Sequence, residues 1–371
     1  MFASPKRASV LAVLSLLAVA CSAAGTSPSA QSASPVAGAT APPASATTES
    51  PTLTAPPRPT PMAIVDGEPW ILYEWFQDGK DTKDLFLVRP DGSDAHAIVT
   101  DIPGEHRAAA WSPDGTQIAF VVRDAETPDG SIWTANADGS GATRLFDGGD
   151  ECESVSHPSW SPDGSKLVMV CYPASTDRPF SIAALDLASM ALTTLATVVW
   201  PEFLDNPPRW SPDGASIAFP ILHLDPTDDH LDGSLVAIVP AAGGKVHRLT
   251  RFETLMSSPD WRPDGRQLVM NSVDLSGIHD TTQPSNLYLI KPDGTGLRQL
   301  THGSVNGEMR IAQPRWTPDG TGIYVSIATT GGPGTTVVYN VMPGFMDAAG
   351  GEPVLVSSSL SGAHPELRPT R

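Results

Sequence analysis

A five-residue stretch, Trp160-Ser161-Pro162-Asp163-Gly164, occurs four more times along the chain with small changes. Each copy reads tryptophan, a variable residue, proline, aspartate and glycine, and after two further residues an apolar run follows. Successive tryptophans are separated by 49, 50, 51 and 55 residues, so the chain is a repeat protein. The repeated residues are Trp111, Asp114, Gly115, Trp160, Asp163, Gly164, Trp210, Asp213, Gly214, Trp261, Asp264, Gly265, Trp316, Asp319 and Gly320.

The letters of this motif predict a tight turn between two β-strands. Proline fixes φ at the first turn position, and the aspartate accepts a hydrogen bond from the backbone two residues further on. Glycine adopts the positive φ that a hairpin turn requires. A second Asp-Gly turn lies about halfway between copies, as in Arg89 to Gly92, Asn136 to Gly139 and Lys291 to Gly294. Two such turns per repeat give four strands, and each tryptophan has an apolar surface that must pack on a neighbouring repeat.

The two ends of the repeat region complement each other. His364 to Pro369 aligns with Gln313 to Pro318, with Leu367 in the place of Trp316, and no further strands follow it. The N-terminal end supplies apolar segments at residues 70–75, 84–88 and 96–100 without an inner strand before them. We therefore predict an all-β, six-bladed β-propeller of four-stranded antiparallel blades, closed by a C-terminal inner strand that joins an N-terminal blade. Closure removes sheet edges that would otherwise favour aggregation.

The five Trp-(Ser/Arg/Thr)-Pro-Asp-Gly copies resemble the WD40-like (PD40) repeats of the TolB-type β-propeller. The resemblance covers roughly residues 69 to 371, within a propeller domain that we expect over residues 61–371. It implies a binding scaffold or an accessory domain of a peptidase, because propellers of this type serve as both. TolB-type proteins carry an N-terminal α/β domain, and we find no pattern for one here.

The N-terminal residues resemble a bacterial lipoprotein signal. Lys6 and Arg7 precede a mostly apolar run that ends at Ala20, which is shorter than the roughly 20 residues of a membrane-spanning helix. We predict a signal peptide over residues 1–20, lipidation of Cys21 and a Ser/Ala/Thr/Pro-rich tether over residues 21–60. This arrangement predicts an exported protein, lipid-anchored at the outer side of a bacterial membrane; the alternative is an ordinary signal peptide cleaved nearby.

The longer connections are expected on one face of the propeller. We label the strands of each blade A to D from the axis outward; the short Asp-Gly turns join A to B and C to D on the short-turn face. The B-to-C and D-to-A connections then form the opposite, long-loop face, which is our candidate binding surface. These connections are Gln77 to Lys83, Arg123 to Ser131, Phe146 to Pro158, Val198 to Pro208, Leu222 to Gly233, Val273 to Ser285 and Thr301 to Gln313.

The charge of the propeller restricts its partners. Of the 23 basic and 41 acidic side chains, three basic and one acidic precede residue 61, which leaves a net charge of −20. Such a surface repels nucleic acid, so we predict none as a partner. The same acidity is also consistent with simple solubility of an exported protein.

Residues near the end of each inner strand approach the central channel. Immediately before the tryptophan position, the last four repeats alternate in charge, which predicts a belt of inter-blade ion pairs. Two residues earlier stand two histidines, which can bind a metal or an anion or have no shared role. The candidate residues are Glu105, His106, Arg107, His157, Arg209, Asp260, Arg315, His364 and Glu366.

One connection is unusually acidic and suggests a calcium site. Calcium prefers several oxygen ligands at adjustable spacing, although this loop does not have the EF-hand spacing. A solvated acidic loop is the alternative, and we expect no other cofactor. The candidate ligands are Asp225, Asp228, Asp229, His230 and Asp232.

Two cysteines remain once Cys21 is assigned to the lipid. Cys152 precedes strand A and Cys171 ends strand B of the same blade, so both lie at the long-loop face. Since an exported protein permits disulfides, we predict that they form one.

Two classes of function remain. The first is a non-enzymatic, membrane-anchored scaffold that binds an envelope protein or a polysaccharide- or peptidoglycan-associated partner. The second is a propeller enzyme, either a lyase or a lactonase-like hydrolase, or a relative of peptidase propellers without the catalytic domain. We assign no catalytic residue, because the sequence has no Gly-x-Ser-x-Gly motif and no repeated set of histidine and carboxylate ligands.

Overall fold

The computed structural model describes residues 67–76, 83–123, 130–149, 152–175, 177–204, 206–227, 231–272, 285–302, 309–329, 340–356 and 362–369. Within these ranges the chain is almost entirely β-strand, with one 3-10 helix, η1 (Phe252–Thr254). None of the helical structure in these ranges is long and apolar enough to cross a membrane. The predicted signal peptide, Cys21 and the tether lie outside the described residues.

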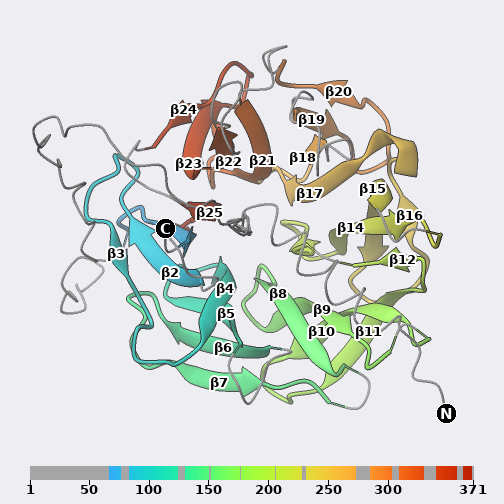
Figure 1. Cartoon of the computed structure of the whole chain (residues 1–371), viewed down its shortest axis with the longest axis horizontal. Coiled ribbons are helices and arrows are strands. Elements are labelled where there is room, and N and C mark those ends of the chain that lie inside the picture. Colours follow the sequence, from blue (N-terminus) through green and yellow to red (C-terminus); the bar gives the residue numbers. More distant parts are fainter. Residues whose placement is uncertain are drawn as a thin grey trace, which may run out of the picture.

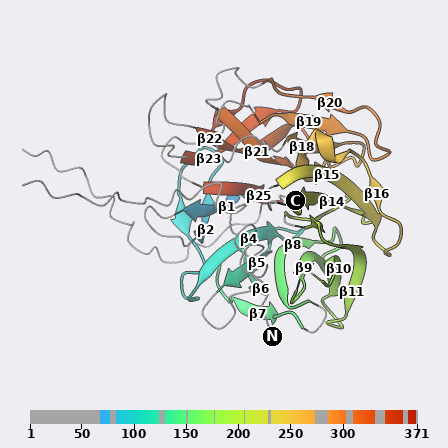
Figure 2. The same cartoon turned by 45° about the vertical axis from the view of Figure 1, so that its right-hand side comes forward.

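Six antiparallel sheets form a ring around a central axis (Figures 1 and 2). From the axis outward, blade 1 contains β25 (Gly362–Leu367), β1 (Ile71–Phe76), β2 (Lys83–Val88) and β3 (His96–Ala97); blade 2 contains β4 (Glu105–Trp111), β5 (Gln117–Arg123), β6 (Ser131–Asn136) and β7 (Thr143–Phe146); blade 3 contains β8 (Ser154–Trp160), β9 (Lys166–Tyr172), β10 (Phe180–Asp186) and β11 (Leu192–Val198).

The second half of the ring repeats this order. Blade 4 contains β12 (Glu202–Phe203) and β13 (Arg209–Trp210), then β14 (Ser216–Leu224), β15 (Leu231–Pro240) and β16 (His247–Arg248); blade 5 contains β17 (Met256–Trp261), β18 (Leu268–Ser272), β19 (Leu287–Ile290) and β20 (Arg298–Gln299); blade 6 contains β21 (Met309–Trp316), β22 (Gly322–Thr329), β23 (Asn340–Asp347) and β24 (Val354–Leu355).

The two ends of the propeller meet in blade 1, which confirms the predicted closure. β25 pairs antiparallel with β1, with Leu367 opposite Ile71. Beyond the strand, Arg368 donates its backbone N–H to the carbonyl of Trp70 (2.7 Å) and its Nε–H to the carbonyl of Gly115 in blade 2 (2.7 Å). The C-terminal segment therefore connects blade 1 to blade 2.

The repeated tryptophans seal several blade interfaces. The indole N–H of Trp111 donates to the carbonyl of Glu366 (3.0 Å), and that of Trp261 donates to the carbonyl of Arg209 (3.1 Å). The following aspartates stabilise the turns: Asp163 Oδ1 accepts hydrogen bonds from Ser161 Oγ (2.6 Å) and from the backbone N–H of Ser165 (3.0 Å). The Ser161 bond is the main cause that lowers the pKa of Asp163 to about 2. Aspartate thus has the turn role that the motif predicts.

A β-bulge interrupts most of the inner strands three residues before the tryptophan position. The register shifts there, and the residue at this position has a positive φ although it is not glycine. Such a bulge redirects the side chain that it carries. Its members are Ala108 (φ 50), His157 (φ 56), Ser258 (φ 50), Gln313 (φ 53) and His364 (φ 58).

Blade 4 differs at this position because it has a proline. Pro207 stands three residues before Trp210, and its ring restricts φ to about −65°, so it cannot adopt the left-handed conformation of the bulge. The inner strand of this blade is divided into β12 and β13. A single residue type therefore explains the irregular blade.

Several long connections are shorter than predicted, because the strands continue into them. β8 begins at Ser154, well before the predicted end of its connection at Pro158, and β15 begins at Leu231 rather than after Gly233. The segments 77–82, 124–129, 273–284 and 303–308 lie outside the described residues. A disulfide joins Cys152 to Cys171 across the β8–β9 hairpin, with 4.9 Å between their Cα atoms.

The closing strand depends on a glycine. A Cβ atom at Gly362 would lie 2.4 Å from the carbonyl oxygen of Glu74 and 2.4 Å from the ring of Tyr73. We expect Gly362→Ala to lower the free energy of unfolding by about 1 to 3 kcal/mol, because β25 must move away from β1. Urea unfolding measures this. Gly149→Ala is the control, since open space surrounds Gly149; an equal loss in both variants would contradict this account of closure.

Candidate functional site on the propeller axis

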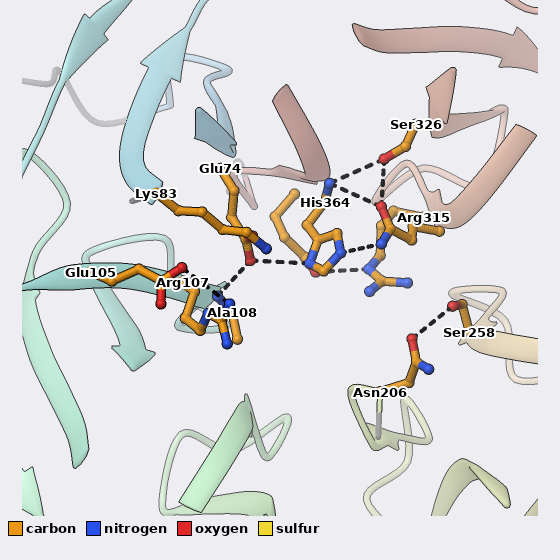
Figure 3. A network of polar contacts seen from close by, with 12 residues as sticks. Glu74, Lys83, Glu105, Arg107, Ala108, Asn206, Ser258, Arg315, Ser326 and His364 are labelled. Atoms are coloured by element: carbon orange, nitrogen blue, oxygen red, sulfur yellow. Dashed lines mark hydrogen bonds and ion pairs between the residues drawn. The ribbon is translucent and has the colours of Figure 1, made fainter. Parts of the chain in front are cut away.

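The inner strands, together with β1 and β2 of blade 1, bring two layers of polar side chains to the axis. The bulge layer lies nearer the long-loop face and contains His157, Gln313 and His364, together with Glu74, Lys83 and Arg107. The ion-pair layer lies nearer the short-turn face and contains Arg209, Asp260, Arg315 and Glu366. We call the two layers the axial site, and Figure 3 shows much of its polar network.

Glu74 is the centre of the bulge layer. Its side chain comes from β1, is 2% exposed and accepts a hydrogen bond from the backbone N–H of Ala108 in blade 2 (2.7 Å). The same oxygen lies 3.1 Å from Nδ1 of His364, and the other oxygen accepts from Nζ of Lys83 (3.2 Å; Figure 3). Burial raises the pKa of Glu74, but the charges of His364 and Lys83 outweigh burial and hold it well below its ordinary value. Glu74 is therefore a carboxylate.

His157 contributes a neutral ring from blade 3. Burial, together with the charge of His364, holds its pKa well below the ordinary value, while Glu74 opposes this shift. His157 lies on β8, the inner strand of blade 3. Its Nδ1 atom is buried and has no hydrogen-bond partner in the described part of the chain.

Gln313 connects blade 6 to the closing strand. Its Oε1 atom accepts hydrogen bonds from Ser326 Oγ (2.7 Å) and from the backbone N–H of His364 (3.2 Å; Figure 3). Its Nε2 atom contacts Nε2 of His364, and its backbone N–H donates to Asn271 of blade 5 (3.2 Å). These bonds fix the His364 ring beside Glu74.

The ion-pair layer differs from the predicted belt of neighbouring pairs. Glu366 Oε1 accepts from Arg315 Nε of the adjacent blade 6 (2.7 Å) and from Arg209 Nη2 of blade 4, on the opposite side of the ring. The side chains of Arg209, Arg315 and Glu366 are only 11%, 5% and 13% exposed. The alternating charges thus form one cluster across the axis, largely shielded from water.

Asp260 belongs to this layer through a different contact. Its Oδ2 atom accepts a hydrogen bond from the backbone N–H of Trp316 in blade 6 (2.8 Å). Burial raises the pKa of Asp260, partly offset by Arg315 and Arg209. For Glu366, by contrast, Arg209 and Arg315 outweigh burial and lower the pKa. Glu366 is therefore the ionised carboxylate that pairs with both arginines.

The two walls of the axial site differ in hydrogen bonding. On blades 1 and 6, the carboxylates and the amide are paired with neighbouring blades, as described above. On three consecutive blades, 2 to 4, buried nitrogen atoms have no partner in the part of the chain that the structure describes: Arg107 Nε, His157 Nδ1 and Arg209 Nε. Unpaired buried polar atoms destabilise a fold by about 1 to 3 kcal/mol each, so this wall suits a ligand that supplies acceptors.

Two of the predicted site residues have other contacts. His106 is 3% exposed, its Nδ1 lies 3.6 Å from Asp84, and its ring meets the ring of Phe120 edge-on. His106 therefore contacts β2 of blade 1 and β5 of blade 2. Glu105 pairs with Arg107 (3.1 Å), and so holds that arginine beside the axis.

Sequence reasoning did not identify Glu74, Lys83 and Gln313 as site residues. Glu74 lies on β1, the second strand of its blade, whereas the repeated motif marks positions on the inner strands. One signal was available: Glu74 is the single charged residue in the otherwise apolar strand Ile71–Phe76. A carboxylate in a buried strand requires partners, which are His364, Lys83 and the Ala108 amide.

Asp225 and Asp232 are the members of the acidic loop of blade 4 that the structure describes. Asp232 Oδ1 lies 2.5 Å from Nδ1 of His223, and Asp225 Oδ1 accepts from the backbone N–H of Thr227 (2.7 Å). Asp228, Asp229 and His230 lie outside the described residues. Among the described residues no group of three or more His, Cys, Asp or Glu side chains is arranged to hold a metal ion. The calcium site stays a prediction.

Comparison with known sequences gives partial matches. No family model matches the chain. An uncharacterized protein of Agrobacterium fabrum is 28% identical over 176 residues, which cover 43% of this chain and 57% of that protein. The Tol-Pal system protein TolB of Nitratidesulfovibrio vulgaris is 39% identical over 56 residues, which cover 15% of this chain and 12% of TolB. The matched regions therefore span less than two thirds of these relatives.

Comparison with solved structures covers most of the chain. TolB of Acinetobacter baumannii superimposes with a TM-score of 0.56 at 19% identity, over 82% of this chain and 67% of that one. A TolB-like protein of Agrobacterium tumefaciens gives 0.57 at 18% identity, over 81% of this chain and 97% of that one. The chain is thus a TolB-like β-propeller in fold.

The buried ion pairs predict a large effect of a small substitution. In Glu366→Gln, Arg209 and Arg315 keep their charges without a carboxylate, and we expect a loss of about 2 to 4 kcal/mol in the free energy of unfolding. The matched control is Glu202→Gln, which removes the more exposed pair of Glu202 with Arg248 and should change stability by at most about 1 kcal/mol. Urea unfolding distinguishes them; similar losses would mean that burial of the cluster contributes little.

His157 predicts a pH dependence. Its folded-state pKa lies below its unfolded value of about 6.5, so below that pH the unfolded chain binds a proton that the folded chain does not. Stability is then lost as pH falls, by about 1 to 2 kcal/mol between pH 6.5 and pH 5. Glu74 affects stability at lower pH. Because its folded-state pKa is lowered, the stability that it contributes is lost only below about pH 4.5.

The test compares unfolding at about pH 7.5 and about pH 5 for the native chain, His157→Gln and His247→Gln. We expect the pH-dependent loss to shrink in His157→Gln and to persist in His247→Gln, because His247 is exposed on β16. An unchanged loss in His157→Gln would show that other groups cause it.

Proposed function

We propose that this protein is an exported, lipid-anchored binding scaffold of the bacterial envelope. The long-loop face and the axial site below it bind an acceptor-rich segment of an envelope protein or envelope polymer. One observation carries this proposal: Arg107, His157 and Arg209 present buried, unpaired nitrogen atoms to the axis from three consecutive blades. A bound segment with carbonyl or carboxylate oxygens would supply their acceptors.

The charges favour a particular kind of segment. The propeller as a whole is strongly acidic, whereas in the axial site Lys83, Arg107 and Arg209 balance the carboxylates with which they pair. A highly acidic partner would be repelled before it reached this site, since the summed charge of a protein acts over its whole surface. The best-suited partner is therefore neutral or basic overall and inserts an oxygen-rich tip.

The proposed envelope location is supported by the N-terminal sequence and by the similarity to TolB. Cys21 follows a lipobox-like run, and the tether over residues 21–60 would separate the propeller from the membrane by roughly 35 Å or more. The TolB of Nitratidesulfovibrio vulgaris belongs to the Tol-Pal system, and the similarity to it supports an envelope role in general. The alternative, a propeller enzyme, has no observation among the described residues that favours it.

The test is capture of a partner from envelope extracts by the full-length protein in detergent. We expect Arg107→Gln combined with His157→Gln to reduce the captured partner by about tenfold, because two donors of the axial site are changed. The matched control is Arg248→Gln, which removes a cation from outer strand β16. All proteins must have the same melting temperature within about 2 °C. Equal capture by the axial variant and the control would overturn the proposal.

A further inference from the structure

A pocket lies at the axis on the short-turn face, where the inner strands end. Blades 1 to 5 all contribute to its lining, and Pro162 of the β8–β9 turn belongs to it. Its volume is about 190 Å³. For comparison, an apolar cavity of roughly 150 Å³ binds one benzene molecule. The pocket therefore suits a small ligand rather than a folded partner.

Three charged side chains line the pocket, Arg209, Asp260 and Glu366, and each keeps hydrogen-bonding capacity. Glu366 accepts both arginine bonds through Oε1, and Asp260 accepts the backbone N–H of Trp316 through Oδ2. The other oxygen of each carboxylate has no hydrogen-bond partner in the described part of the chain. Arg209 donates to Glu366 through Nη2, and its Nε and Nη1 atoms are unpaired among the same residues. The pocket thus offers acceptors and donors that are both charged.

Apolar side chains form most of the remaining wall. Trp111, Trp210 and Leu367 belong to it, and the indole N–H of each of these two tryptophans is bonded to a carbonyl of the preceding blade. Trp160 also lines the pocket, but its buried indole nitrogen has no partner among the described residues. The indole nitrogen of Trp316 is equally unpaired, although Trp316 is not among the residues that line this pocket. Trp160 therefore adds an unsatisfied donor to an otherwise apolar wall.

We propose that this pocket binds a free α-amino acid with an apolar side chain. Its α-carboxylate would accept hydrogen bonds from Arg209 and Trp160, its α-ammonium group would donate to the open oxygens of Asp260 and Glu366, and its side chain would pack on the apolar wall. An anion alone would be repelled by the two carboxylates, and a cation alone would leave the guanidinium nitrogens unpaired. A zwitterion satisfies both signs through charge-assisted hydrogen bonds.

This inference goes beyond the proposed function. The ligand enters from the short-turn face, opposite to the long-loop face, and it is a free small molecule rather than a segment of an envelope partner. The two sites share Arg209, whereas Trp160 lines only the pocket and His157 belongs only to the bulge layer. Variants of these unshared residues can therefore test the two proposals separately.

The test titrates the full-length protein in detergent with leucine by calorimetry. Three analogues each lack one part of the ligand: N-acetylleucine has no ammonium group, leucinamide has no carboxylate, and glycine has no apolar side chain. We expect saturable binding of leucine and at least about tenfold weaker binding of each analogue. No saturation by leucine up to about 20 mM would overturn the proposal, and so would binding of N-acetylleucine or leucinamide as tight as that of leucine.

Two tryptophan variants locate the ligand. Trp160→Phe removes the indole N–H but keeps an aromatic ring, and we expect it to weaken leucine binding about two- to tenfold. Trp316→Phe is the matched control, because it removes an equally unpaired indole N–H outside the pocket and should bind leucine as the native chain does. Both variants should keep the native melting temperature within about 2 °C, since neither indole N–H has a partner to lose. Equal losses in both variants would overturn the assignment to this pocket.

The same variants separate this proposal from the proposed function. Trp160→Phe should leave capture of the envelope partner unchanged, and Arg107→Gln combined with His157→Gln should leave leucine binding unchanged within about twofold. Loss of leucine binding in the Arg107 and His157 variant would overturn the proposal of a separate site.

Discussion

The pairing of β25 with β1 is the contact on which the rest of the molecule depends. It closes the ring, and the same strand also places His364 beside Glu74 and Glu366 between Arg315 and Arg209. When β25 pairs with β1, it therefore closes the ring and completes the axial site at the same time. A chain that failed to pair β25 would expose the edge of β1 and would leave two buried arginines without their carboxylate.

The bulge in most of the inner strands converts a structural repeat into a site. An inner strand without it would keep strict alternation, and the residue three before the tryptophan would follow the pleat. The positive φ at His157, Gln313 and His364 carries a steric penalty that any residue other than glycine must meet. The same positive φ recurs in five of the described inner strands, while residue identity at the bulge varies. Variation on a fixed backbone is how one propeller scaffold acquires different ligands.

Much of the fold could be predicted from the sequence, because the repeat has a turn motif whose letters each have a steric reason. Proline, aspartate and glycine specify the hairpins, and the position of Leu367 specifies the closure. The axial site was predicted in part. Arg209, Arg315 and Glu366 occupy repeated positions, whereas Glu74 and Lys83 lie on strands where no copy marks them. Their role follows from tertiary contacts across blades 1, 2 and 6, which no local pattern contains.

The distribution of unpaired polar atoms separates the two faces of the molecule. On blades 2 to 4 the unpaired nitrogens of Arg107, His157 and Arg209 surround the axis, where a partner can enter from the long-loop face. Nearer the short-turn face, the repeated tryptophans divide into two groups: Trp111, Trp210 and Trp261 donate to the preceding blade, whereas the buried indole nitrogens of Trp160 and Trp316 have no partner among the described residues.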